Sequence, residues 1–93
     1  MEKFFAGIEG VLSMKVRSHD GFECYEAYFA NGYGANLARG HGSYGGDDGL
    51  WELAVMKGGD LCYTTPITND VVGYLSEKEA RALCEKIAQL PAA

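Results

Sequence analysis

Residues 50–75 read LWELAVMKGGDLCYTTPITNDVVGYL, and this stretch decides the fold because it holds the densest run of apolar residues in the chain. Its first part, residues 50–56, alternates in the way that places strand side chains on the two faces in turn. Trp51, Leu53 and Val55 share one face, whereas the other face is mixed. We therefore predict a β-strand here, with the only tryptophan of the chain on its apolar face.

A hairpin turn follows this strand. Gly58 and Gly59 readily adopt the positive φ angles that tight hairpin turns require. Residues 61–65 are rich in β-favouring side chains and predict the returning strand. Pro66 has no N–H to donate to a neighbouring strand, so the pairing is expected to end near it.

Two more strands are predicted before the hairpin. Residues 11–17 alternate, with Leu12, Met14 and Val16 on the face that we expect to be buried. An Asp-Gly pair, which is typical of tight hairpin turns, then leads into a strand over residues 22–30. Both faces of this strand are partly apolar, which indicates a central place in the sheet with a helix covering one side.

Shorter segments carry weaker patterns. Residues 35–39 fit a short third strand. Residues 1–9 suit a short helix and an entering strand about equally, since their apolar spacing favours a helical turn and their glycines weaken it. Residues 40–49 are rich in glycine and predict a long surface loop. Asn69 and Asp70 predict a turn or the cap of a short helical turn.

The C-terminal part of the chain carries the strongest helix signal. Ser76 and Glu79 have the spacing of a capping box, in which each side chain bonds to the backbone N–H of the other residue. The helix is expected over residues 77–89, with Pro91 stopping it. Its apolar stripe at helical spacing consists of Ala80, Leu83, Cys84, Ile87 and Leu90.

These elements follow one another as five strands and then a helix. A chain of 93 residues favours one domain. We predict a single α+β domain over residues 1–93, with an antiparallel sheet of four or five strands and one C-terminal helix packed on a face.

The formal net charge is −5, from 13 acidic and 8 basic residues. Because Lys and Arg are not clustered, direct binding to nucleic acid or to an anionic membrane is disfavoured. No apolar run approaches the roughly 20 residues of a membrane span, and no signal peptide is expected. The three cysteines, Cys24, Cys62 and Cys84, lack CxxC spacing, so we predict buried free thiols, no disulfide framework and a cytoplasmic location.

Two patterns near residue 45 suggest ligand binding. The segment 40–45 matches G-x-G-x-x-G, but a strand is expected to follow it where a phosphate site needs a helix, and Asp47 and Asp48 would repel a phosphate. The same two aspartates and Glu52 offer oxygens to a hard cation, although their spacing matches no EF-hand loop. A glycine-rich loop with solvated acidic residues is the preferred interpretation, so no metal and no cofactor are predicted.

A catalytic group is not evident either. His19 and His41 fall in predicted turns, and a nucleophile such as Cys24 or Ser43 would have to lie beside one of them. Nothing in the sequence places these groups together. We therefore predict solvated or hydrogen-bonded histidines, no catalytic residues and no enzymatic activity.

Ring side chains with a polar group are numerous, with six tyrosines and one tryptophan. Such residues are common both in the cores of small β proteins and at protein interfaces. Because binding residues often lie on loops held by a rigid sheet, those near the glycine-rich loop are the best candidates for recognition. The predicted protein-binding residues are Tyr33, Tyr44, Asp47, Asp48 and Trp51.

The strings NGYGA at 31–35, YGG at 44–46, GLWELAV at 49–55 and LCYxTPITxDVxGYL at 61–75, in which x is any residue, resemble small uncharacterised proteins of tailed phages and prophages. The resemblance covers about residues 31–90 and brings no catalytic motif with it. It implies a bacterial cytoplasm during infection and a host protein or defence complex as the partner.

Two hypotheses from different classes follow. The first is a small acidic, non-enzymatic module that binds a host or phage protein, with inhibition of a host defence as one form. The alternative is a structural, self-assembling protein in which an exposed strand edge or an aromatic face forms a homodimer. A small-ligand or metal-binding domain built on the glycine-rich loop ranks below both.

Overall fold

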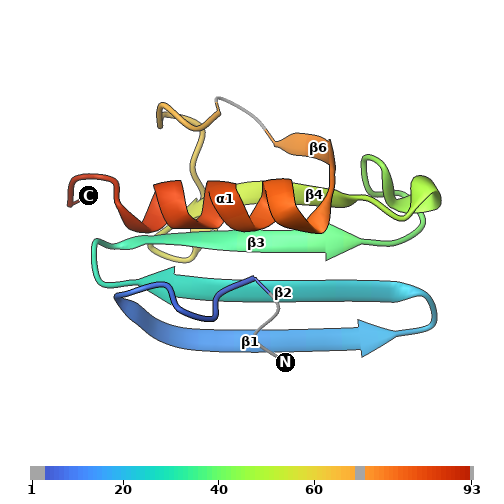
Figure 1. Cartoon of the computed structure of the whole chain (residues 1–93), viewed down its shortest axis with the longest axis horizontal. Helices are drawn as coiled ribbons and strands as arrows, with labels where there is room; N and C mark the ends of the chain where they lie inside the picture. Colours follow the sequence, from blue (N-terminus) through green and yellow to red (C-terminus); the bar gives the residue numbers. More distant parts are fainter. Residues whose placement is uncertain (1–3, 69–70, 93) are drawn as a thin grey trace.

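The computed structural model describes residues 4–68 and 71–92, which form an antiparallel six-stranded sheet with one α-helix packed on it (Figure 1). The elements are β1 (Val11–His19), β2 (Phe22–Phe29), β3 (Tyr33–Arg39), the 3-10 helix η1 (Gly46–Asp48), β4 (Trp51–Lys57), β5 (Asp60–Leu61), β6 (Val72–Leu75) and α1 (Glu77–Ala88). The predicted α+β class and the C-terminal helix are confirmed. The sheet has one strand more than the four or five expected.

The strands run in the order β1-β2-β3-β4-β5, and β6 pairs with β4 on the same side as β5. β5 pairs with the end of β4 at Met56 and Lys57, whereas β6 pairs with its start at Trp51 and Leu53. One edge of the sheet is therefore the long strand β1, and the other is divided between two short strands.

Both predicted hairpin turns are present. Asp20 and Gly21 have φ angles of 38° and 79°, and Gly58 and Gly59 have φ angles of 62° and 89°. Positive φ at both central residues matches the right-handed twist of the strands that such turns connect. The returning strand after Gly59 is shorter than the predicted 61–65.

The chain leaves β4 soon after this turn. The Cys62 N–H still donates to the Val55 carbonyl oxygen at 2.8 Å, after which the chain crosses to the start of β6. β6 was not predicted from the sequence. The turn predicted at Asn69 and Asp70 lies outside the described residues.

The core lies between the sheet and α1. Trp51, Leu53 and Val55 share the helix-facing side of β4, as predicted, and are at most 1% exposed. The core residues on the other elements include Tyr25, Ala27, Phe29, Ala35, Leu37, Ala80, Cys84 and Ile87.

The N-terminal segment is neither the helix nor the strand considered above, because residues 4–10 form turns. The ring of Phe4 packs edge-on against Trp51 and Tyr25, with centroid distances of 4.7 Å and 5.3 Å. The Arg81 guanidinium on α1 donates a hydrogen bond to the Ala6 carbonyl oxygen. The segment thus lies beside α1 over the β2 part of the sheet (Figure 1).

The prediction that Leu12, Met14 and Val16 are buried is wrong. Their exposed fractions are 72%, 42% and 42%. A helix with its side chains is about 10 Å wide and strands lie about 4.8 Å apart, so one helix covers about two neighbouring strands. α1 packs on β3, β4 and β6, and the N-terminal segment covers β2, so the helix-facing side of β1 is left open at Met14 and Val16.

The capping box at the start of α1 is confirmed. The Glu79 N–H donates to Ser76 Oγ at 3.1 Å, and the Ser76 N–H donates to Glu79 Oε1 at 2.8 Å. This backbone hydrogen bond from Ser76 also lowers the pKa of the Glu79 carboxyl group. At the other end, Asn31 Nδ2 donates to the carbonyl oxygens of Ile87 and Leu90 at 2.8 Å and 3.0 Å, which ties the end of α1 to the β2–β3 turn.

Replacing Ser76 by Ala removes the acceptor for the Glu79 N–H, so we expect Ser76→Ala to lower the free energy of unfolding by about 0.5–2 kcal/mol. Urea denaturation followed by circular dichroism measures this. Ser18→Ala, an exposed serine in β1, is the matched control and should change little. Equal stability of the two variants would mean that the cap does not support the helix.

The three cysteines are free and buried, as predicted. Burial raises the pKa of the Cys84 thiol from its ordinary value of 9.0 to about 12. Above about pH 9 the unfolded thiol loses its proton while the folded thiol keeps it, so the unfolded state binds fewer protons. The free energy of unfolding should therefore fall with rising pH, by up to about 1.4 kcal/mol per pH unit for this one group.

Denaturation series from about pH 8 to about pH 11 measure this slope. Cys84→Ala is the comparison, since the tyrosines titrate in both proteins and only the thiol differs. The variant should lose stability less steeply with rising pH than the parent chain. Parallel slopes would contradict the assignment of a neutral, buried thiol to Cys84.

Candidate protein-binding surface

The glycine-rich loop between β3 and β4 is held by its own hydrogen bonds. Ser43 Oγ accepts from the Gly40 N–H at 3.0 Å and donates to the Gly40 carbonyl oxygen at 2.8 Å. Further along, the N–H groups of Asp48 and Leu50 both donate to the Gly45 carbonyl oxygen, at 3.0 Å and 2.9 Å. The predicted surface loop is thus a series of turns around η1 with a defined path.

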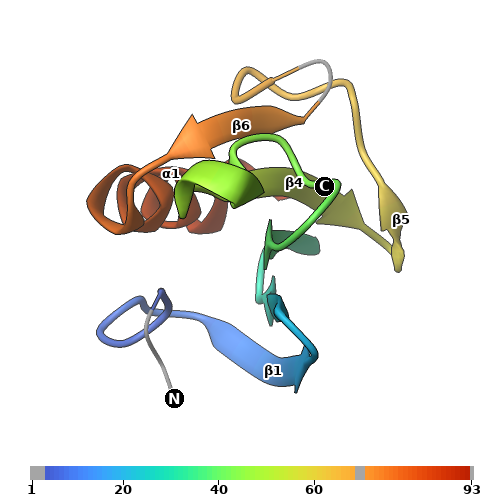
Figure 2. The same cartoon turned by 90° about the vertical axis from the view of Figure 1, so that its right-hand side faces the viewer.

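This loop packs against β6 so closely that only glycine fits at two positions. A Cβ atom on Gly73 would lie 2.4 Å from Tyr44 Cβ, and one on Gly45 would lie 2.8 Å from Tyr74 Cα. The Tyr74 N–H donates to the Tyr44 carbonyl oxygen at 3.1 Å. Figures 1 and 2 show the loop and β6 side by side at one end of the sheet.

Two tyrosine side chains project from this contact. Tyr44 is 60% exposed and Tyr74 is 61% exposed, although their backbones adjoin. Asp47 and Asp48 in η1 follow Tyr44 closely in the chain and are also exposed. We call these four residues, Tyr44, Asp47, Asp48 and Tyr74, the tyrosine surface.

The backbone on both sides of Tyr44 is fixed. Its N–H donates to Glu52 Oε1 on β4 at 2.7 Å, and its carbonyl oxygen accepts from Tyr74. Nearby, His41 Nδ1 lies 3.5 Å from Asp47 Oδ1 at the solvent-exposed rim of the loop. The tyrosine surface is therefore exposed in its side chains and ordered in its backbone.

Tyr74 has an unusual backbone conformation. Its φ angle is 58°, in the left-handed region that costs a residue with a Cβ atom about 1–2 kcal/mol. Residues held in such conformations often cluster at functional sites, where the surrounding contacts maintain them. Here the contacts with Gly45 and Tyr44 maintain the conformation, and it turns an aromatic side chain outward.

The structure brings together three of the five predicted binding residues, Tyr44, Asp47 and Asp48. Trp51 is only 1% exposed, so its ring belongs to the core and is not available to a partner. Tyr33 is half-buried and pairs with the far end of β4, about 17 Å along the sheet from the residues that hold Tyr44.

Tyr74 was missed because no sequence pattern reports a left-handed tyrosine. The only available signal is the Gly73-Tyr74 pair itself, since a glycine inside an apolar run often marks a close approach of another backbone.

Trp51 is linked to the glycine-rich loop through Arg39. The Arg39 guanidinium carbon lies 4.4 Å from the centroid of the Trp51 ring, and Arg39 Nη1 donates to the Gly49 carbonyl oxygen at 3.2 Å. Glu23 Oε1 accepts from Arg39 Nε at 3.1 Å. The core aromatic thus orders the exit of the loop through an arginine that is itself held by an ion pair.

The glycine-rich loop does not lead into a regular α-helix, and the candidate nucleophiles contact other groups. Residues 40–45 follow β3 and precede a 3-10 helix of only three residues. Ser43 Oγ is engaged within its own turn, and Cys24 lies beside Asn36 on the sheet face away from α1. In the described part of the chain, no group of three or more His, Cys, Asp or Glu side chains gathers as metal ligands would.

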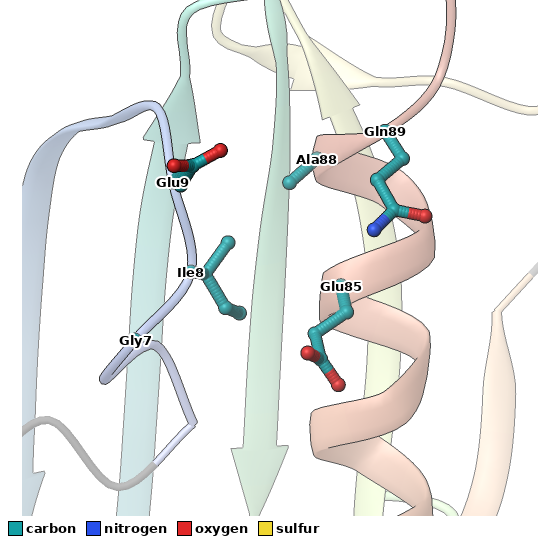
Figure 3. Close-up of a pocket in the computed structure, with 6 residues that line it drawn as sticks. All are labelled: Gly7, Ile8, Glu9, Glu85, Ala88 and Gln89. Atoms are coloured by element: carbon teal, nitrogen blue, oxygen red, sulfur yellow. The ribbon is translucent and has the colours of Figure 1, made fainter.

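A groove of about 300 Å³ lies between the N-terminal turns and α1 (Figure 3). It is lined by Gly7, Ile8, Glu9, Glu85, Ala88 and Gln89. Its polar side chains are the carboxylates of Glu9 and Glu85 and the amide of Gln89.

Across residues 4–68 and 71–92, no helix has the length and apolar character needed to cross a membrane. Comparison of the chain with protein-family models, with curated proteins and with solved structures finds no match.

The left-handed backbone conformation of Tyr74 leads to a prediction about the free energy of unfolding. Tyr74→Gly removes a side chain that buries little area and relieves the left-handed strain, while the added freedom of glycine in the unfolded chain partly offsets the gain. We expect the free energy of unfolding to stay equal or rise by up to about 1 kcal/mol.

Urea denaturation of the purified variant measures the change. Tyr63→Gly is the matched control, because Tyr63 is 45% exposed and has no positive φ angle. This control should lower stability. A loss in Tyr74→Gly as large as in the control would show that the Tyr74 ring packs more than its exposure indicates.

Proposed function

We propose that the chain is a non-enzymatic protein-binding module, of the kind encoded by phages, that binds a host or phage protein in the bacterial cytoplasm. Inhibition of a host defence protein is one form of this activity. The observation that carries the proposal is the exposure of Tyr44 and Tyr74, at 60% and 61%, on a backbone held by close glycine contacts.

The side-chain chemistry supports binding to a protein. Tyrosine is enriched at protein interfaces because it combines a large apolar ring with a hydroxyl group and has only two rotatable side-chain bonds. In many protein interfaces a few clustered residues, often tyrosines, supply most of the binding free energy. Two exposed tyrosines on adjoining backbones could act as such a cluster.

The fixed backbone supports it as well. Association has to overcome the loss of freedom in loops and side chains, and a surface that is already ordered loses less. Gly45 and Gly73 let the loop and β6 meet at backbone distance, and Tyr74 keeps a strained conformation within that contact.

The charges favour a basic partner. Asp47 and Asp48 are exposed, and within the described residues no lysine or arginine lies at ion-pair distance from either. A partner with a basic patch would be attracted electrostatically to these aspartates, and the range of this attraction decreases as the salt concentration rises. The acidic net charge of −5 acts in the same direction.

The test is capture from a nuclease-treated bacterial lysate with the tagged chain, followed by identification of the retained proteins. We expect a protein that the parent chain retains and that a Tyr44→Ser and Tyr74→Gly double variant loses. Tyr63→Ser should retain it, since Tyr63 follows β5 at the far end of β4. Thermal melting of each variant confirms that it is folded.

For a captured partner, Asp47→Asn combined with Asp48→Asn should slow association and weaken its dependence on salt. Surface plasmon resonance at two salt concentrations measures both. A partner that the double tyrosine variant binds as tightly as the parent chain would refute the tyrosine surface as the binding site. Failure of the parent chain to retain any protein would count against the module itself.

A further inference from the structure

β1 is a long, unprotected edge of the sheet. This strand of nine residues pairs with β2 on one side, and no other described strand pairs with it on the other (Figure 2). The opposite edge is divided between β5, with two residues, and β6, with four. A free edge presents a row of backbone N–H and C=O groups to which another strand can add.

This edge strand exposes apolar side chains, whereas the exposed edge strands of monomeric proteins commonly carry charged ones. Leu12, Met14 and Val16 are three of the four large aliphatic side chains that the described residues expose, the fourth being Leu61. Met14 lies opposite Ala27 and Val16 lies opposite Tyr25, so both point to the side of the sheet that carries α1. The free backbone edge and an exposed apolar stripe therefore coincide on one strand.

We propose that two copies of the chain associate by antiparallel pairing of their β1 strands. The two-fold axis of this dimer passes between the two Met14 residues, which lie directly opposite each other. The two sheets then form one continuous sheet, and Met14 and Val16 of the two copies lie together on the face that carries both helices. This inference does not rest on the proposed function, because it concerns the edge of the sheet farthest from the tyrosine surface.

The charged and apolar side chains of β1 together favour this register over its neighbours. With the axis at Met14, Leu12 lies opposite the partner's Val16, and Ser13 lies opposite the partner's Lys15. Moving the axis to Lys15 would set that residue against the partner's Lys15. Like charges directly opposite each other on paired strands are destabilising.

The register one step beyond Lys15 has the same defect. With the axis at Val16, Lys15 would face the partner's Arg17. In the opposite direction, an axis at Ser13 would set Lys15 against the partner's Val11, and Val16 against the partner's Gly10, beyond the start of β1. The axis at Met14 keeps the basic residues opposite neutral ones and pairs Leu12 with Val16 and Met14 with Met14.

The length of the pairing is limited by the irregular start of β1. The register with β2 shifts between Val11 and Ser13, which is a β-bulge. A bulge bends an edge strand away from a partner, so the regular pairing is centred on residues 13–15, with Leu12 and Val16 at its ends. Contacts of this size fall in the transient class, which buries less than about 1,200 Å², and the dimer should dissociate on dilution.

The first test is the mass in solution, measured by sedimentation equilibrium from low micromolar to near millimolar concentration. The parent chain should shift from the mass of one chain to that of two. Met14→Lys should remain at the mass of one chain at every concentration, because it sets two like charges together on the axis. Leu61→Lys is the matched control, since Leu61 is exposed to a similar degree on the opposite edge, and it should dimerise as the parent does.

Met14 is exposed, so the substitution should leave the fold intact, and circular dichroism with thermal melting checks this. A parent chain that stays at the mass of one chain over the whole range overturns the proposal. Dimers that survive Met14→Lys and are lost in Leu61→Lys overturn it equally, because they place the interface on the opposite edge.

The second test examines the register. Residues directly opposite each other in antiparallel strands have Cα atoms about 4.5–5.5 Å apart, which a disulfide can bridge. Under a mild oxidant, Met14→Cys should form a covalent dimer, with both thiols giving up their protons and electrons to the oxidant. Lys15→Cys and Val16→Cys should form far less, and the parent chain gives the background from its buried cysteines. Preferential cross-linking at residue 15 or 16 would overturn the register.

Discussion

The packing around the Trp51 ring is the interaction on which the rest of the structure depends. Phe4 and Tyr25 meet it edge-on at 4.7 Å and 5.6 Å, and the Arg39 guanidinium covers it at 4.4 Å. These contacts join the N-terminal turns, β2, β3 and β4 in one place. Edge-on ring pairs and a cation over a ring add to the free energy of simple burial. Since Arg39 also binds the Gly49 carbonyl oxygen, the same ring determines where the glycine-rich loop rejoins the sheet.

The sequence predicts those parts of the fold that depend on neighbouring residues in the chain. The Gly58-Gly59 turn, the capping box of Ser76 and the alternation along β4 are all present, because each is decided within a few residues. β6 was missed, since its pairing partner is the start of β4 and the long irregular crossing before it carries no strand signal. Such pairing depends on what the rest of the sheet leaves unoccupied.

Burial is predicted from the sequence only in part, and the reason is geometrical. The alternation of Leu12, Met14 and Val16 predicts a strand with an apolar face, but it does not reveal whether anything covers that face. Trp51 shows the opposite case, because a residue beside an exposed loop is covered by Phe4 from a distant part of the chain. Whether a strand face is covered depends on how all the elements are arranged. Here one helix of 12 residues packs on a sheet that is wider than the helix.

The two uncovered regions differ in whether their backbone hydrogen-bonding groups are already paired, and each therefore suits the kind of contact proposed for it. At the tyrosine surface, close backbone contacts fix Tyr44 and Tyr74, and such rigidity suits a partner of fixed shape. Along β1 the backbone itself is free, and a free edge accepts any strand that matches its spacing, so specificity must come from Lys15 and its neighbours. Because the regions lie at opposite edges of the sheet, a β1-paired dimer would carry two tyrosine surfaces. Two linked sites strengthen binding to a repeated target without any new contact.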